Sequence, residues 1–432
     1  MAWSNWAGNQ RCNPDEVAHP STDAELSAVV KGAAARGRRV KVVGSGHSFT
    51  ACALTDGVQI VLDRYNKIIA VDTRANTVTV QAGMTIADLN KLLFSYGMAM
   101  PNLGDIAYQT ISGAISTATH GTGAKLTGIA GQVLGLDIVT GDGTLVSCSV
   151  TEEPTIFESA RVGVGALGAL STVTLQCVPK FNLRAVEEPV RVDTVLDEID
   201  ARVANNEHFE FFWVPHTGWA LTKSNNRTTA PAAGQSRWDF FKDKIVMENI
   251  AFGAVTKLGR LRPEAIPRLS RLIPSAGRVE YVKPSHQIFA SPRWVKFYEM
   301  EYAVPRQHVV EALNGIRKVI DDKKLFIGFP VEVRFTAPDD IALSTASGRE
   351  TAYLAVHVAK GMDYETYFRG VEDVMNELDG RPHWGKLHFQ TADVLATRYP
   401  KWEAFQRVRA QLDPGGVFSN AYTDRVLGPI AS

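Results

Sequence analysis

The sequence predicts an α+β protein built from two domains. Three observations lead to this prediction: the length, the alternation of helix and strand signals, and a change of texture after Pro179. A chain of 432 residues has room for about two or three domains, each with its own core. Glycine-rich turns recur before Pro179, whereas aromatic residues and long strand patterns become more frequent after it. We therefore expect a domain boundary near residue 179.

The first domain begins with a helix whose two ends are marked in the sequence. Thr22 and Glu25 form a capping box, a pattern that satisfies free N–H groups at a helix N-terminus. Apolar residues follow at helical spacing, and Gly37 supplies a stop. Hydrophobic and turn patterns then predict strands at 40–43, 58–62 and 77–80, a helix capped by Thr85 and Asp88, a hairpin of 133–139 with 145–146, and a strand at 170–177.

The second domain is predicted to alternate long strands with amphipathic helices. Strand patterns occur at 209–214, 294–304 and 330–336. Apolar residues from Val310 to Ile320 recur at helical spacing and predict a helix. The polar segment Ser224–Gln235 is predicted to be a mobile loop.

Composition excludes several classes of protein. The 46 basic and 46 acidic residues give a formal net charge of zero, so nucleic acid is not expected as a partner. No stretch approaches the roughly 20 apolar residues of a membrane-spanning helix, and the N-terminus lacks the pattern of a signal peptide. The 4 cysteines are far apart and contain no Cys-x-x-Cys. We expect a cytoplasmic protein, for which peripheral association with a membrane stays open.

Three glycine-rich stretches follow strand candidates in the first domain, at 44–49, 103–123 and 163–168. Glycine allows backbone N–H groups to converge on phosphate oxygens. A dinucleotide-binding Rossmann turn is disfavoured because Phe49 occupies the third glycine position, which also argues against a nicotinamide-dependent dehydrogenase. The stretches are either independent turns or loops that converge on one extended, phosphate-bearing ligand.

Several motifs in order resemble the vanillyl-alcohol-oxidase-type flavoproteins, and within them the aldonolactone oxidoreductases. The resemblance rests on Val43-Gly-Ser-Gly-His-Ser-Phe49, Ile111-Ser-Gly113, His120-Gly-Thr-Gly123, Gly165-Ala-Leu-Gly168, Phe329-Pro-Val-Glu-Val-Arg-Phe335, Arg381-Pro-His-Trp-Gly-Lys386, Leu412-Asp-Pro414 and Phe418-Ser-Asn-Ala-Tyr422. It implies an FAD-binding domain of the PCMH type at 1–178 and a substrate-binding cap domain at 179–405, with an antiparallel sheet flanked by helices. The segment 406–432 would return to the flavin site.

By this resemblance, the glycine stretches bind FAD and His47 bonds covalently to the flavin 8α-methyl carbon. Taken alone, the position of His47 favours a histidine that merely hydrogen-bonds a nearby carbonyl. The other positions that match the FAD-binding motifs are Val43, Gly44, Ser45, Gly46, Ser48, Ser112, Gly113, Ala118, His120, Gly121, Gly123, Gly168 and Asn420.

Glu332 and Arg334 alternate with apolar residues on a strand, so their side chains share one face. Spacing alone also fits a surface ion pair. The resemblance implies that Glu332 binds lactone hydroxyls, that Arg334 stabilises developing negative charge, and that Lys386 points at the N1–C2=O edge of the flavin. His383, His388 and Glu332 could instead be metal ligands, but their spacing matches no standard zinc motif, and no metal is expected. Trp384 is expected to be a packing residue.

The resemblance implies hydride transfer from C2 of an aldono-1,4-lactone, such as L-gulono-1,4-lactone, to flavin N5. The product would be a 2-keto lactone that tautomerises to an ascorbate-type enediol, with Glu332 and a water both open as the base. Ala118 occupies a position where family members with alanine behave as dehydrogenases, so we expect cytochrome c or a quinone-like acceptor in preference to oxygen. The alternatives are an oxygen-using oxidase of alditols or other sugars, and a flavin-binding protein without turnover.

Overall fold

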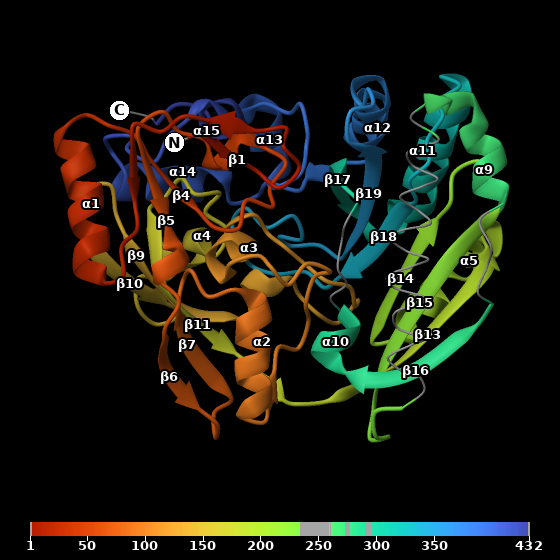
Figure 1. The fold of residues 1–432 in the computed structure, drawn as a ribbon, viewed down its shortest axis with the longest axis horizontal. Helices are drawn as coiled ribbons and strands as arrows, with labels where there is room; N and C mark the ends of the chain where they lie inside the picture. Colours follow the sequence, from red (N-terminus) through yellow and green to blue (C-terminus); the bar gives the residue numbers. More distant parts are fainter. Residues whose placement is uncertain (1, 234–258, 260, 273–276, 290–294, 431–432) are drawn as a thin grey trace.

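The computed structural model describes residues 2–233, 259, 261–272, 277–289 and 295–430. Figure 1 shows two units side by side, one built mainly from the red-to-yellow part of the chain and the other from the green and teal part. Each unit has its own large cluster of buried hydrophobic residues. Helices and strands occur in both units, which confirms the predicted α+β class.

Two sheets form the centre of the first unit. One is a three-stranded parallel sheet of order β3-β5-β4, and the other a five-stranded antiparallel sheet of order β10-β9-β11-β7-β6. The strands are Glu16–Ala18 (β3), Val40–Val43 (β4), Val58–Val61 (β5), Ile68–Asp72 (β6), Thr77–Gln81 (β7), Val133–Val139 (β9), Leu145–Ser149 (β10) and Ala169–Gln176 (β11). The helices are Asp23–Ala35 (α1), Ile86–Ser95 (α2), Ile111–Ser116 (α3) and Pro154–Ala160 (α4). Short strands pair as β1 (Trp3–Ser4) with β2 (Arg11–Cys12) and β8 (Met98–Ala99) with β12 (Val178–Pro179).

The predicted helix starts and the predicted hairpin are confirmed. The hydroxyl of Thr22 accepts from the backbone N–H of Glu25 at 3.2 Å, and that of Thr85 accepts from Asp88 N–H at 3.1 Å. Both bonds satisfy N–H groups that a helix leaves without a partner in its first turn. The hairpin pairs Leu145 with Val139, so the turn lies at the predicted place.

The second unit is an eight-stranded antiparallel sheet of order β16-β13-β15-β14-β18-β19-β17-β20. Its strands are Asn182–Arg191 (β13), His208–Trp213 (β14), Trp219–Thr228 (β15), Val279–Pro284 (β16), Phe297–Pro305 (β17), Val331–Thr336 (β18), Thr351–Ala359 (β19) and Arg381–Pro382 (β20). Its helices are Val192–Asp197 (α5), Ile199–Ala204 (α6), Ile266–Leu272 (α9), Ser285–Phe289 (α10), Val309–Asp322 (α11) and Glu365–Glu377 (α12). Residues of α5, α6, α11 and α12 pack with one face of the sheet in the second core.

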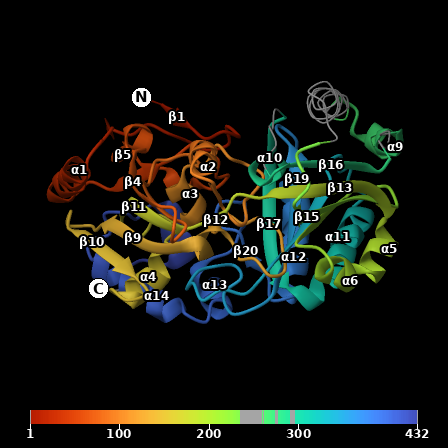
Figure 2. The ribbon, with the colours of Figure 1, turned by 90° about the horizontal axis from the view of Figure 1, so that it is seen from below.

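The opposite face of this sheet turns towards the first unit. On β18, Val331, Val333 and Phe335 belong to the second core, so the alternate residues Glu332 and Arg334 project from the other face. Figure 2 shows the sheet between these helices and the first unit. The polar side chains of β17 and β18 therefore meet the loops of the first unit.

The C-terminal part of the chain returns to the first unit. Helices α13 (Ala392–Arg398), α14 (Trp402–Leu412) and α15 (Ala421–Leu427) contribute to the first core, as does Trp384 with 0% exposure. The chain re-enters the core of the first unit at Trp384, which lies within the range 179–405 that the sequence assigns to the cap domain. Trp384 is a packing residue, as predicted.

The predicted mobile loop at Ser224–Gln235 is wrong for Ser224–Thr228, whereas residues 229–233 do lie outside the helices and strands and are joined to β16 by one isolated bridge at Ala233. Ser224 to Thr228 complete β15, which lies between β13 and β14 and pairs with β13 through Arg227 and Leu183. The side chain of Asn226 has a partner there: its Oδ1 accepts from Glu207 N–H at 2.8 Å. Gln235 lies outside the described residues, as does Trp294 at the start of the strand predicted at 294–304, which begins at Phe297. None of the described helices is long and apolar enough to span a bilayer.

Candidate active site

A cleft opens between the two units and collects side chains from both. It is lined by His47, Ser48, Gly104, Asp105, Ile106, Gln109, Thr117, Thr119, His120, Phe297, Glu299, Glu301, Glu332, Arg334, Ala355, His357, His383, Gly385 and Lys386. Six residues predicted from the sequence lie here together: His47, Ser48, His120, Glu332, Arg334 and Lys386. The structure therefore joins the candidate flavin-anchoring histidine and the candidate substrate-binding strand in one place.

Arg334 is the centre of the charge arrangement on the sheet side of the cleft. Its guanidinium contacts three carboxylates: Asp105 at 2.5 Å, Glu210 at 2.8 Å, and Glu332 at very short range. Burial alone lowers the pKa of this group, but the three carboxylates outweigh that effect and raise the pKa of Arg334 well above its usual value. Arg334 is thus a permanent cation whose five N–H donors match several acceptors at once. The surface ion pair that spacing alone allows is wrong, because both Glu332 and Arg334 are buried.

Asp105 and Glu210 were not singled out from the sequence. Asp105 lies in the second glycine-rich stretch and Glu210 on β14, the neighbour of β18 in the sheet. Glu210 is separated from Arg334 by 124 residues in the chain. Only the strand order brings these two residues together.

Two buried glutamates on β17, Glu299 and Glu301, contact basic side chains from other parts of the chain. Glu299 and Glu301 are alternate residues and both line the cleft. Glu299 pairs with Lys386 at 2.5 Å and lies 3.5 Å from the imidazole of His357. Burial raises the pKa of Glu299, but Lys386 and His357 outweigh burial and lower it to about 2. Glu301 receives a hydrogen bond from His120 at 2.6 Å, and despite burial this partner holds the pKa of Glu301 below its usual value.

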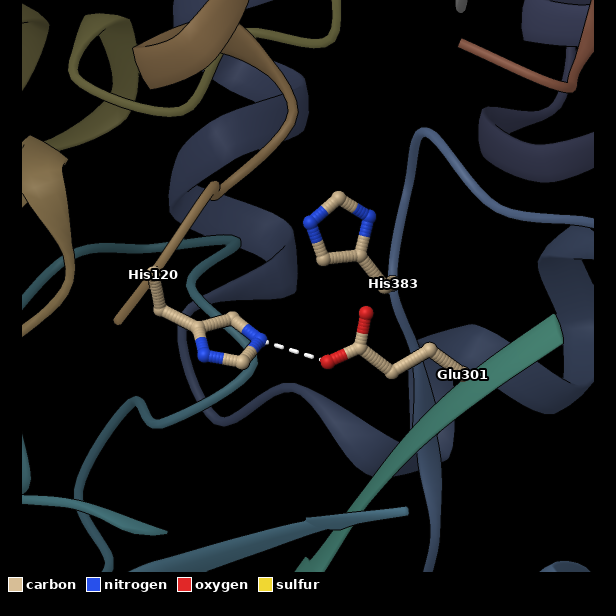
Figure 3. Close-up of side chains that lie close together, drawn as sticks. All are labelled: His120, Glu301 and His383. Carbon is tan, nitrogen blue, oxygen red and sulfur yellow. Dashed lines mark hydrogen bonds and ion pairs between the residues drawn. The ribbon is translucent and has the colours of Figure 1, made fainter. Parts of the chain in front are cut away.

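Figure 3 shows His120, Glu301 and His383 gathered in a buried group whose ligand atoms are close enough to surround an ion. The hydrogen bonds do not match a metal site. His383 Nδ1 accepts from Gly385 N–H at 3.0 Å, and burial lowers the pKa of His383 to about 4, so the neutral ring carries its proton on Nε2. His120 contacts Gly121 O at 2.9 Å through one ring nitrogen and Glu301 through the other. Each histidine is thus already engaged by a partner within the protein.

The second acidic group is likewise not arranged for a cation. Asp105, Glu210 and Glu332 also have oxygens within metal-binding range of one another. The Arg334 guanidinium already lies among these oxygens and supplies the positive charge. His388, considered from the sequence as a ligand, instead faces the hydroxyl of Tyr422 at 3.1 Å.

The three glycine stretches converge around helix α3. A Cβ on Gly44 would lie 2.2 Å from the hydroxyl of Thr110, which caps α3, so only glycine permits this approach of the first stretch to the second. Ser45 donates to the carbonyl of Tyr108 at 2.5 Å. The third stretch reaches the end of α3 through Val164 N–H, which donates to Ser116 O at 3.0 Å. The three stretches are therefore neighbours in space.

His47 ends the first stretch at the cleft. Its Nδ1 is buried and has no hydrogen-bond partner among the described residues, and its ring stacks on Trp6 with centroids 5.8 Å apart. Burial, and then the charge of Lys386, lowers the pKa of His47 to about 4, so the ring is neutral and Nδ1 or Nε2 retains a nucleophilic lone pair. An unpartnered buried nitrogen at the end of a glycine cradle is what an 8α-histidyl flavin requires. The residues present therefore fit FAD.

Ala118 has an unusual backbone conformation. Its φ is +62°, in the left-handed region that favours glycine, although its side chain is buried. Its neighbours Thr117 and Thr119 both line the cleft. The chain thus keeps a strained alanine beside the site.

The remaining sequence-predicted FAD residues support the cleft from outside its lining. Five of them belong to the strand, helix and loop that carry His47 and His120, namely Val43, Ser112, Gly113, Gly121 and Gly123. The N–H of Gly123 donates to Phe335 O at 2.7 Å and joins this loop to β18. A Cβ on Gly168 would lie 2.5 Å from Val139 O, which makes this glycine a strand-packing residue. Asn420 caps α15 and donates to the carbonyls of Ala51 and Leu54, both at 2.9 Å.

Comparisons with known proteins agree with this geometry. The family described as D-arabinono-1,4-lactone oxidase matches residues 173–426, and the FAD binding domain matches residues 14–149. The chain belongs to the D-arabinono-1,4-lactone oxidase family. As a member, it is an FAD-dependent oxidoreductase that acts on CH–OH groups.

Relatives and solved structures support this membership over the whole chain. An L-gulono-1,4-lactone dehydrogenase of Mycobacterium tuberculosis is 43% identical over 99% of both chains. An L-gulonolactone oxidase of Bos taurus is 34% identical over 99% of this chain and 98% of its own. The crystal structure of a cholesterol oxidase from B. sterolicum superposes with a TM-score of 0.82 at 16% identity, covering 99% of this chain and 96% of that one. That likeness shows the shared fold, which confirms the vanillyl-alcohol-oxidase-type architecture expected from the motifs.

Proposed function

We propose that the protein oxidises L-gulono-1,4-lactone, or a close relative, at C2 to the 2-keto lactone. The observation that carries this proposal is the Arg334 guanidinium, held among three carboxylates at the wall of a cleft that also contains His47 and Lys386. A sugar lactone presents several hydroxyl groups and one carbonyl. Carboxylates accept hydrogen bonds from hydroxyls, and a guanidinium donates to carbonyl or alkoxide oxygens, so the two partners are complementary.

FAD would be held by His47, through a covalent bond, and by the backbone of the glycine stretches that pack around α3. When bound there, FAD supplies the acceptor for the two electrons removed from the substrate. Lys386 contributes a positive charge to the same cleft, which favours a reduced, anionic cofactor. The orphaned Nδ1 of His47 is the structural support for covalent attachment.

His357 is the best placed of the cleft residues to accept the substrate proton. Its Nδ1 lies 3.1 Å from Pro330 O and donates there, which leaves the lone pair on Nε2. Nε2 lies 3.5 Å from the Glu299 carboxylate at the wall of the cleft. Glu332 is already engaged by the Arg334 guanidinium, and its carboxylate is suited to accept hydrogen bonds from lactone hydroxyls.

Reactivity with oxygen is expected to be poor. Ala118 keeps a side chain beside the cleft at a backbone position that prefers glycine. The relative of Mycobacterium tuberculosis carries the name dehydrogenase and that of Bos taurus the name oxidase. We therefore propose cytochrome c or a quinone-like molecule as the acceptor, in preference to oxygen.

Replacement of Arg334 tests the substrate site. In Arg334→Lys, one cation remains but the fork of donors is lost, and kcat/KM for L-gulono-1,4-lactone should fall by about a hundredfold or more, the loss of two charge-assisted hydrogen bonds. The FAD content and visible spectrum should stay unchanged. Substrate profiling of the same preparations against alditols addresses the alternative raised by an alditol oxidase of Streptomyces sp., which is 29% identical. An alditol preference, or an unaffected kcat/KM in Arg334→Lys, would contradict the proposal.

A further inference from the structure

Lys386 does not enter the cleft as an isolated cation. Its ammonium lies 2.5 Å from Glu299 Oε2, and the side chain of Glu299 is only 7% exposed. Charge-assisted contacts of this kind are strong where water is largely excluded. We propose that Glu299 is a positioning residue that holds the Lys386 ammonium, offsets its charge, and thereby sets the reduction potential of the flavin in this cleft. This inference rests on the proposed function, because it takes Lys386 as the cation that acts on the cofactor.

Glu299 carries its negative charge throughout the working pH range. Its pKa is lowered to about 2, because Lys386 and His357 outweigh the effect of burial. Reduction of a flavin adds negative charge, so a fixed carboxylate nearby disfavours reduction and a fixed cation favours it. The Glu299–Lys386 pair therefore produces a weaker positive electrostatic potential at the flavin than Lys386 alone would. Neutralising Glu299 should expose the full effect of the ammonium.

Glu301 provides an internal comparison on the same strand. It is the alternate residue on β17, is as deeply buried as Glu299, and also lines the cleft. Its partner is His120, at 2.6 Å, rather than Lys386. The same substitution at Glu301 therefore removes a carboxylate from the same strand and cleft without removing the partner of Lys386.

Glu299→Gln removes the carboxylate that faces the Lys386 ammonium, so the flavin potential should shift positive. Glu301→Gln leaves the Glu299–Lys386 contact in place, so the potential of that variant should shift less. A purely structural role for Glu299 predicts no such difference between the two variants.

Glu372 supplies a matched control outside the cleft. It is a buried glutamate on α12 that accepts hydrogen bonds from the hydroxyl of Tyr302 and, at 2.9 Å, from Phe389 N–H. Glu372→Gln should disturb folding about as much as Glu299→Gln, with no change in flavin potential. Loss of stability and change of potential are thereby separated.

The experiment measures the flavin midpoint potential of the wild-type holoenzyme and the three variants by dye-equilibrated reduction at neutral pH. A positive shift in Glu299→Gln, with no shift in Glu372→Gln, is the expected result. An unchanged or more negative potential in Glu299→Gln would overturn the inference. If Glu299→Gln does not fold, Glu299→Asp draws the carboxylate away from Lys386 and should give a smaller positive shift, whose absence is equally decisive.

Failure of the proposed function would look different. In that case wild-type flavin would not be reduced by any aldonolactone, or the protein would not retain FAD. If only the present inference fails, aldonolactones will still reduce the wild-type flavin, but the midpoint potential will not change in Glu299→Gln. The two results are told apart in the same preparations.

Discussion

Ala118→Gly tests the strained alanine through two readouts, stability and oxygen turnover. A residue other than glycine in the left-handed region costs about 1–2 kcal/mol, which the substitution should recover at φ +62°. Against this, glycine adds about 0.4–1 kcal/mol of unfolded-chain entropy, and the lost methyl group removes about 0.8 kcal/mol of burial. The opposing contributions nearly cancel. We expect the free energy of unfolding to change by less than about 1 kcal/mol.

Ala114→Gly is the matched control. Ala114 is fully buried within the helix α3, four residues before Ala118 in the chain, and has no positive φ. Here the substitution lowers helix propensity and removes a buried methyl group, and it relieves no backbone strain. The free energy of unfolding should therefore fall by about 2 kcal/mol. Urea unfolding of the two holoenzyme variants should differ by about 1–2 kcal/mol in favour of Ala118→Gly. Equal destabilisation would refute the strain argument.

The same two variants test access of oxygen. Removing the Ala118 side chain should raise turnover with oxygen as acceptor, while Ala114→Gly should leave it low. Anaerobic reduction of the flavin by the lactone serves as the check that Ala118→Gly is intact. If reduction is normal and oxygen turnover does not rise, Ala118 does not control oxygen reactivity.

Two further predictions concern histidines of the cleft. His47→Ala should release FAD into the supernatant on acid precipitation, whereas the wild-type pellet should stay yellow; wild-type release would contradict covalent attachment at His47. His383 has a folded-state pKa of about 4, below the ordinary value for histidine, because of burial. The unfolded chain therefore binds the extra proton first, and stability should rise with pH between about 4 and 6.5, by up to about 3 kcal/mol from this group. His383→Gln should flatten that part of the pH–stability curve, and an unchanged curve would show that His383 is not held neutral.

The sequence was sufficient for the parts of the site that depend on local pattern. Strand alternation places Glu332 and Arg334 on one face, and the glycine stretch places His47 at the end of a turn. These features require only near neighbours in the chain. The structure confirms that the three residues lie in one cleft.

The residues that surround Arg334 and Lys386 depend on strand order instead. Glu210 reaches Arg334 because β14 lies beside β18, and Glu299 reaches Lys386 because the chain leaving β20 passes β17. No local pattern encodes these adjacencies. One signal was available: Glu299 and Glu301 alternate within an otherwise apolar strand, and buried acidic residues need cationic partners.

The prediction at Ser224–Thr228 failed for a related reason. Polar composition indicates a loop only when the backbone lacks partners, and here β13 and β14 supply them on both sides. A polar side chain is tolerated in a strand where it finds a hydrogen-bond partner, as Asn226 does with Glu207. Tertiary context therefore overrides composition.

The central claim is that a flavin in this cleft accepts electrons from an aldonolactone bound at Glu332 and Arg334. The most direct measurement is anaerobic mixing of the holoenzyme with L-gulono-1,4-lactone while the visible flavin absorbance is recorded. The account predicts rapid bleaching by the lactone, slower or no bleaching by an alditol such as xylitol, and no lactone bleaching in Arg334→Met. Bleaching by dithionite but by no lactone would contradict it.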